Sequence, residues 1–255
     1  MNNCVFGKSM ENVRKRQNIK LVTTKQKFLK YTSKPTFLNS KIFNSEFAAV
    51  HYVKEKLVLD KPVYVGFCVL DISKTLMYDF HYGFIKSTYG SKAKLLFTDT
   101  DSLCYEIKTD DVYQDCYEAN HMFDLSDLKG KYNNNINKKV IGKMKLEHPN
   151  DPITEFIGLK SKMYSIKLNS DKEEKKAKGV VKCVVKKNLR HEMYGATLQK
   201  SSKMYSEMNV IRSVKHRVYT MTINKISLSA YDDKRYILDD GITSYAYGHY
   251  KTTQG

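Results

Sequence analysis

The sequence predicts a mixed α+β fold, in which an antiparallel sheet with an acidic β-hairpin is backed by one long helix and followed by a mainly helical C-terminal part. Three patterns lead to this prediction. Apolar residues recur every three or four positions between 62 and 89, and two strand-like runs at 94–98 and 102–107 flank a short acidic turn. The segment from 188 onward has helical character and is predicted to be a small separate module. A chain of 255 residues with a hydrophobic fraction of 41% can bury a sizeable core in one or two domains.

The N-terminal part is predicted to contain short helices and strands. Residues 6–17 include good helix formers and end on a basic run, which suits the negative end of a helix dipole. A short strand is predicted at 19–23, and a helical turn or two at 25–31 is stopped by Pro35. Partial alternation of apolar and polar residues at 37–59 predicts two further short strands.

The clearest helix in the sequence begins near Pro62 and ends before Gly90, two residue types that favour helix starts and stops. Its apolar stripe consists of Val65, Val69, Ile72, Leu76, Phe80 and Phe84. Because the stripe is continuous, we expect this face to be core, packed under a sheet.

Beyond the acidic hairpin, the sequence predicts a helix at 111–119 with acidic residues in its first turn, and a loop at 128–137. Alternating residues at 156–168 and 177–186 predict two strands. A charged turn at 169–175 is expected to join them.

Several classes of protein are disfavoured by the composition. No apolar run is long enough to span a bilayer, and the first fifteen residues are too polar for a signal peptide, so we expect an intracellular protein with no membrane partner. The five cysteines form no CxxC pair and have no histidine at ligand spacing, so we expect reduced thiols rather than disulfides or a zinc site.

The net charge of +17 is unevenly distributed along the chain. Residues 1–34 contribute +8 and residues 156–188 contribute +7, whereas residues 35–155 between them carry −2. Lysine-rich runs are commonly just solvated faces. Two such runs around an acidic centre instead indicate a phosphate-binding surface with a cation site inside it, because carboxylates beside a polyanion need metal ions to offset the repulsion.

The acidic turn of the hairpin carries Asp99 and Asp101, two carboxylates at positions i and i+2. On an extended chain this spacing directs both side chains to the same side, where they can approach one cation. Mg²⁺ favours one or two carboxylates completed by water and substrate phosphates, so the pair suits metal-assisted phosphoryl transfer. The alternative is an ordinary Asx-turn, because Asp-x-Asp is frequent in loops.

Four sequence motifs together resemble those of the family B DNA polymerases. Residues 95–103 read Leu-Leu-Phe-Thr-Asp-Thr-Asp-Ser-Leu, which is similar to the palm motif of that family. Lys162-Met163-Tyr164 resembles the Lys-x-Tyr element that holds the primer-template, and Lys178-Gly179 resembles a downstream Lys-Gly element. Residues 3–7 resemble the end of the fingers motif, with Cys4 and Phe6 where the family has Ser and Tyr. Over nearly its whole length, the sequence resembles the polymerases of large self-replicating DNA transposons and related protein-primed viral elements.

The resemblance implies a role for each matched residue. Asp99 and Asp101 would be catalytic and would hold two Mg²⁺ ions together with an upstream Asp, while Asn3, Gly7 and Thr100 would border the nucleotide. The DNA contacts would come from Lys160, Lys162, Tyr164, Lys178 and Gly179. The implied partners are primer-template DNA, deoxynucleoside triphosphates and, where initiation is protein-primed, a terminal protein.

The resemblance also implies domain boundaries. It divides the chain into the end of the fingers with the start of the remaining palm (1–34), the palm with the catalytic hairpin (35–155), the primer-template-gripping strands (156–187) and the thumb (188–255). The sequence contains neither the family's Asp-x-x-Ser-Leu-Tyr-Pro motif nor the fingers Lys. We therefore expect a C-terminal fragment of a DNA-directed DNA polymerase that is inactive by itself, with part of the long helix or a sheet edge left uncovered.

Alternative interpretations remain for these residues. Lys160 and Lys162 alternate along a predicted strand and would equally suit the solvent side of an amphipathic sheet, and Tyr164 would suit a half-buried strand aromatic. The chain as a whole would also suit an inert, truncated element that only binds nucleic acid. An RNA-synthesising enzyme is a third possibility, which the Asp-Thr-Asp-Ser wording and the Lys-x-Tyr strand disfavour.

Overall fold

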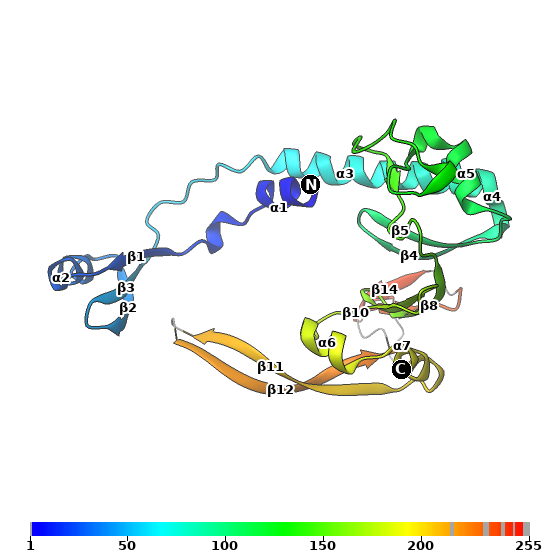
Figure 1. Cartoon of the computed structure of the whole chain (residues 1–255). Helices are drawn as coiled ribbons and strands as arrows, with labels where there is room; N and C mark the ends of the chain where they lie inside the picture. Colours follow the sequence, from blue (N-terminus) through cyan, green and yellow to red (C-terminus); the bar gives the residue numbers. More distant parts are fainter. Residues whose placement is uncertain (1, 215–216, 232–234, 241–242, 247, 252–255) are drawn as a thin grey trace. The chain divides into compact units, whose positions relative to one another are not determined.

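The computed structural model describes residues 2–214, 217–231, 235–240, 243–246 and 248–251. Its helices and small, mostly antiparallel sheets confirm a mixed α+β fold (Figure 1). The chain divides into two compact units, one formed by Met1–Asp79 with Ile211–Tyr219 and the other by Phe80–Val210 with Thr220–Gly255. None of the described helices combines the length and the apolar composition that a bilayer-spanning segment needs.

The first unit contains a three-stranded antiparallel sheet covered by a short helix. The strands β1 (Asn18–Val22), β2 (Phe37–Asn44) and β3 (Phe47–Tyr52) lie in the order β1-β3-β2, and α2 is Lys25–Thr32. Thr24 caps α2, since its hydroxyl accepts a hydrogen bond from the Lys27 main-chain N–H. Val22, Ala48, Val50 and Tyr52 form the buried core of this sheet, and Phe28, Tyr31 and Phe37 pack against it. The strands and helix predicted for 19–59 are confirmed.

Two helices of the first unit pack side by side, α1 (Asn2–Ser9) and α3 (Val63–Tyr78) (Figure 1). The close approach depends on Gly66, because a Cβ at this position would lie 2.7 Å from Cγ of Met10. The predicted single helix at 6–17 is wrong in its bounds. Asn12 instead caps a separate 3-10 turn, η1 (Val13–Lys15), through its side-chain oxygen, as Asn commonly does where a helix begins.

The long helical segment predicted from Pro62 exists, but it is not uniform. α3 continues into a π-helical stretch, η2 (Asp79–Lys86), and a last turn, α4 (Ser87–Tyr89). The prediction that its whole apolar stripe is core is wrong for the first half, and the prediction that part of the long helix is left uncovered is confirmed there. Ile72 is 68% exposed and Leu76 is 40% exposed, whereas Phe80 is only 7% exposed. An apolar stripe indicates which face can be buried, but burial itself requires a packing partner.

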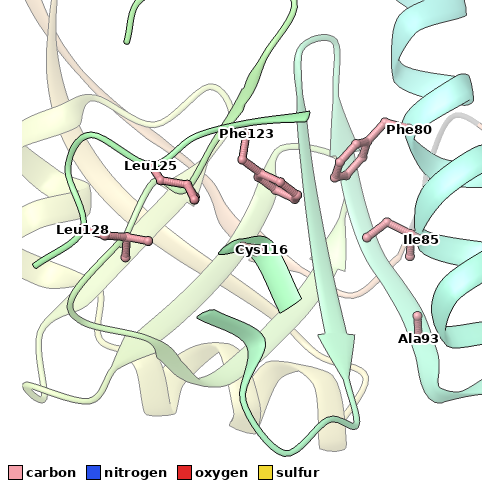
Figure 2. Packing of buried hydrophobic residues seen from close by; sticks show 7 residues of the cluster. All are labelled: Phe80, Ile85, Ala93, Cys116, Phe123, Leu125 and Leu128. Atoms are coloured by element: carbon pink, nitrogen blue, oxygen red, sulfur yellow. The ribbon is translucent and has the colours of Figure 1, made fainter. Parts of the chain in front are cut away.

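The acidic hairpin lies in the second unit and is formed by β4 (Ala93–Asp99) and β5 (Ser102–Ile107), as predicted. The end of the helical segment backs it. Phe80 and Ile85 point toward the hairpin and toward Phe123 (Figure 2). Partly buried residues of the hairpin, Leu103, Tyr105 and Ile107, pack against this cluster.

The remaining elements around this core are short. The predicted helix α5 (Val112–Glu118) is confirmed and is capped by the Asp111 carboxylate, which accepts hydrogen bonds from two main-chain N–H groups. The others are η3 (Gly90–Lys92), η4 (Asn120–Met122), η5 (Gly130–Tyr132) and a parallel pair of two-residue strands, β6 (Phe123–Asp124) and β7 (Met144–Lys145).

A second sheet of this unit is antiparallel, in the order β10-β9-β8, and carries two helices. Its elements are β8 (Ile153–Lys160), β9 (Met163–Leu168), β10 (Glu173–Ala177), α6 (Lys182–Asn188) and α7 (His191–Gln199). Tyr194 of α7 and Leu228 are fully buried at the centre of its core.

The predictions for 156–186 need correction. The run at 156–168 is two strands separated by a tight turn, and the predicted strand at 177–186 is wrong, because β10 ends at Ala177 and α6 follows. Residues 173–175, predicted as part of the turn at 169–175, pair with β9 in register. Lys and Glu are poor strand formers by themselves, so pairing with a neighbouring strand decides their conformation.

The prediction of a mainly helical segment at 188–255 is also wrong within the described residues. After α7 the chain forms β11 (Lys203–Val214), β12 (Arg217–Ser229), β13 (Arg235–Ile237) and β14 (Ser244–Ala246). The two long strands pair with each other. Their runs are rich in β-branched and aromatic residues, which favour a pleated strand over a helix.

Candidate functional site

The acidic turn joins β4 to β5 within three residues. Asp99 ends β4, Thr100 has a left-handed φ of 56°, and the Asp101 main-chain N–H donates to the Asp99 carbonyl at 2.6 Å. The Ser102 hydroxyl also donates to the Asp99 carbonyl, at 3.2 Å. A non-glycine residue in the left-handed region costs about 1 kcal/mol or more. Such strain persists where the surrounding structure holds it, and it is frequent in functional turns.

The prediction that Asp99 and Asp101 point to the same side of an extended strand needs correction. The chain is not extended between Asp99 and Asp101, because Thr100 reverses its direction. The Asp99 side chain is 37% exposed and Asp101 is exposed. Both carboxylates therefore lie on an accessible turn. Because the chain reverses between them, the two side chains are not aligned as residues i and i+2 of a single strand would be.

A second tight turn, between β8 and β9, meets the acidic turn. Its residue Lys162 also has a left-handed φ, 59°, and its Nζ lies 3.0 Å from Oδ1 of Asp99. The Lys162 side chain is 54% exposed, so the ion pair is half in solvent and contributes about 1 kcal/mol or less to stability. Its significance is therefore positional. A lysine ammonium group is placed at the first carboxylate of the pair.

Aromatic stacking holds the same two strand pairs together. The ring centroids of Phe97 and Tyr164 are 4.5 Å apart with an interplanar angle of 23°, and Phe156 stacks on Phe97 at 5.8 Å. Stacked pairs of this kind contribute about 0.5–1.5 kcal/mol beyond the burial of their area. The structure thus brings Lys162 and Tyr164, predicted as a Lys-x-Tyr element, against the strand that ends in Asp99.

The Tyr164 ring lies in a partly buried, negatively charged environment. Burial raises the pKa of the Tyr164 hydroxyl, and the charges of Glu147 and Asp99 add to this shift. The hydroxyl is therefore protonated at neutral pH and is available as a hydrogen-bond donor. The same burial agrees with the alternative interpretation of Tyr164 as a half-buried strand aromatic.

The other predicted DNA-binding residues lie around the second turn. The Lys178 main-chain N–H donates to the Lys162 carbonyl at 3.1 Å, and Gly179 has a left-handed φ of 88°. Lys160 differs from the prediction in one respect. Its ammonium group donates to the main-chain carbonyl of Tyr231 at 2.9 Å, so it contributes to packing within the chain.

The residues predicted to border the nucleotide are divided between the two units. Thr100 lies at the acidic turn in the second unit, and Gly7 lies within α1 of the first. A Cβ at Gly7 would meet no heavy atom within 4 Å, so packing inside the chain does not require glycine there. The Asn3 side chain lies outside the described part of the chain. The roles of Asn3 and Gly7 stay predictions.

The acidic turn fits part of a Mg²⁺ site. Mg²⁺ at phosphoryl-transfer sites is held by one or two carboxylates together with water and substrate phosphates, which is the number of carboxylates that Asp99 and Asp101 supply. Among the described residues, no group of three or more His, Cys, Asp or Glu side chains is placed to hold a metal ion. The remaining ligands would have to come from the substrate or from another protein segment.

Two features of this site were not foreseen from the sequence. The stacking of Phe97 on Tyr164 had no signal, because aromatic residues in alternating strands are ordinary core residues. The approach of Lys225 to Gly179, where Nζ lies 3.4 Å from the Gly179 carbonyl oxygen, joins residues far apart in the chain. Only the folded chain brings these pairs together.

No protein-family model, curated protein or solved structure matches this chain.

Proposed function

We propose that this chain is the palm-hairpin part of a family B DNA-directed DNA polymerase, which adds deoxynucleotides to a primer 3′-hydroxyl. The observation that carries the proposal is the ion pair between Lys162 and Asp99. Two motifs that resemble separate elements of that family, and that are far apart in the sequence, meet at atomic distance.

The chemistry of the site supports phosphoryl transfer. In this proposal Asp99 and Asp101 hold Mg²⁺, which when bound activates the primer hydroxyl and stabilises the leaving pyrophosphate. Lys162 contacts a backbone phosphate of the primer-template and leaves Asp99 when the cation binds. Tyr164 holds β9, the strand that follows the turn of Lys162, against β4. The second metal-binding Asp and the lysine that neutralises the triphosphate would be supplied by residues outside this chain.

A binding measurement tests the role of Lys162. We expect the 255-residue chain to bind a fluorescent primer-template duplex with strong salt dependence. Lys162→Met should weaken binding on all sequences and reduce the slope of log K against log salt by about 0.9. Lys74→Met on α3 removes the same charge from an exposed position outside both basic runs and is the matched control. Equal effects of the two substitutions would contradict the proposed contact.

A spectroscopic measurement tests the metal site without relying on turnover. With primer-template and deoxynucleotide present, Mn²⁺ should broaden the amide NMR signals of Thr100 and Asp101. Asp101→Asn should abolish this broadening while leaving DNA affinity unchanged or higher. Signals that stay sharp at saturating DNA would refute a cation site at this turn. We expect negligible primer extension by the chain alone, because losing groups that stabilise transition-state charge costs several kcal/mol.

The second candidate function is a nucleic-acid-binding element without catalysis. It is favoured by the position of the Lys162 ammonium group, which already neutralises Asp99 within the chain. Tight duplex binding with no Mn²⁺ broadening would select it. If extension is observed with any longer form of the protein, a comparison of ribonucleotides with deoxyribonucleotides separates RNA synthesis from DNA synthesis.

A further inference from the structure

A strongly basic surface lies beside the proposed site and has no assigned role. Residues 176–190 contain six basic residues and no acidic residue. Helix α6 buries Val185 in the core of the second sheet and leaves Lys182, Lys186 and Lys187 exposed. Among the described residues, none of these three ammonium groups takes part in an ion pair with a carboxylate.

This arrangement is unfavourable for the helix by itself. Lys182 and Lys186 are at positions i and i+4, where like charges destabilise a helix by about 0.2–0.5 kcal/mol. No nearby carboxylate in α6 offsets this repulsion. Positive charge that is held together without compensation favours an external polyanion, because binding relieves the repulsion.

The surface is connected to the acidic turn through a series of contacts. Lys162 reaches Asp99, the Lys178 main-chain N–H binds the Lys162 carbonyl at 3.1 Å, and α6 begins four residues after Lys178. Lys225 of β12 joins at Gly179, where its Nζ lies 3.4 Å from the carbonyl oxygen. A Cβ on Gly179 would lie 2.8 Å from this Nζ, so glycine permits the approach. Main-chain contacts thus link the turn that carries Lys162 to the segment before α6, and Lys225 lies at the same segment.

We propose that Lys182, Lys186, Lys187 and Lys225 form a second phosphate-binding surface, which holds duplex DNA beyond the acidic turn. The inference rests on the proposed function and adds the path of the duplex to it. Lysines bind phosphates as point charges and do not read bases. α6 contains no aromatic residue, and single-strand binding surfaces depend on aromatic stacking. The ligand is therefore the backbone of a duplex, whatever its sequence.

The test compares two triple variants of the full chain that remove equal charge. Lys182→Gln, Lys186→Gln and Lys187→Gln alter α6. The control variant carries Lys56→Gln, Lys74→Gln and Lys108→Gln, which replace three exposed lysines outside both basic runs. Gln is nearly as good a helix former as Lys, so both variants should fold, and circular dichroism checks this. Binding of a fluorescent duplex is followed by anisotropy between about 50 and 200 mM salt.

We expect the α6 variant to reduce the salt slope by about 2.7, which is three contacts at 0.9 each, and to weaken binding at least tenfold more than the control variant. Lys225→Gln should reduce the slope by about 0.9. Equal slopes in the two triple variants would overturn the inference while leaving the proposed function standing. If the unaltered chain binds no duplex at all, both fail. If the α6 variant loses binding to phosphatidylserine vesicles but keeps duplex binding, the surface is a lipid site and the inference is wrong.

Discussion

The contact between the acidic hairpin and the second sheet can be tested through the stacked pair of Phe97 and Tyr164. We consider Phe97→Leu, Tyr164→Leu and the double variant. Leucine keeps apolar volume in each strand but removes the stacked rings, whose centroids are 4.5 Å apart. The single variants therefore lose the ring interaction and some packing, while the double variant loses the ring interaction only once. The difference measures how strongly the two rings are coupled.

The expected coupling follows from the geometry. A stacked aromatic pair contributes about 0.5–1.5 kcal/mol beyond burial, and the small interplanar angle of 23° places this pair among well-formed stacks. Phe156 also stacks on Phe97, at 5.8 Å, and retains part of the interaction when Tyr164 is replaced. We therefore expect a coupling free energy of about 1 kcal/mol, a roughly fivefold change in the opening equilibrium.

Native-state hydrogen exchange is the appropriate assay. The chain contains two compact units, so global unfolding need not be a single transition, whereas exchange reports the opening of individual strands. Amides of β4 and β9 should show the coupling. Tyr164→Phe keeps the ring and is the control, in which Phe97→Leu should cost as much as in the unaltered chain. A coupling free energy within about 0.3 kcal/mol of zero would refute the stacked contact.

Three further outcomes are expected. Gly179→Ala should destabilise the second unit by about 1–2 kcal/mol, because φ is 88° there, and an unchanged urea midpoint would contradict that backbone conformation. Burial raises the pKa of Cys104 to about 11 and of Cys116 to about 12, above the ordinary value of 9. Both thiols should therefore alkylate far more slowly than the exposed Cys183, and a mass-spectrometric time course measures this difference. Because the pKa values of Cys104 and Cys116 are raised in the folded state, the stability that the two neutral thiols contribute is fully present below pH 9. It should be lost as the pH rises through about 11 to 12, which urea titrations at several pH values measure. For Asp124, burial opposes ionisation, but hydrogen bonds from the main-chain N–H groups of Ser126 and Lys139 and the charge of Lys145 outweigh it and lower the pKa to about 2. Because this pKa lies below the ordinary value of 3.8, its stabilisation is present above that pH and should be lost as pH falls toward 2, and Asp124→Asn should remove this acid dependence.

Elements whose signals are local were predicted correctly from the sequence. The hairpin at 93–107 combines alternating strands with turn residues, and α5 begins at an Asp cap, so both depend on neighbours within a few positions. The strand β10 and the hairpin β11–β12 were missed. Glu173 to Lys175 were predicted to lie in a turn, but they form a strand because they pair with β9. The residues after Gln199 were predicted to be helical, although their β-branched and aromatic residues favour strands, and β11 and β12 pair with each other.

For the candidate site too, the local features were predictable from the sequence and the contacts between distant residues were not. The sequence by itself determined the acidic turn, the Lys-x-Tyr run and the basic segments, because charge, turn chemistry and motif spacing are properties of the linear chain. Only the tertiary structure decided that Lys162 lies 3.0 Å from Asp99, that Tyr164 stacks on Phe97, and which half of the long helix is buried. These facts depend on contacts between residues far apart in the chain. Such contacts arise from the mutual packing of whole elements, which no local pattern specifies.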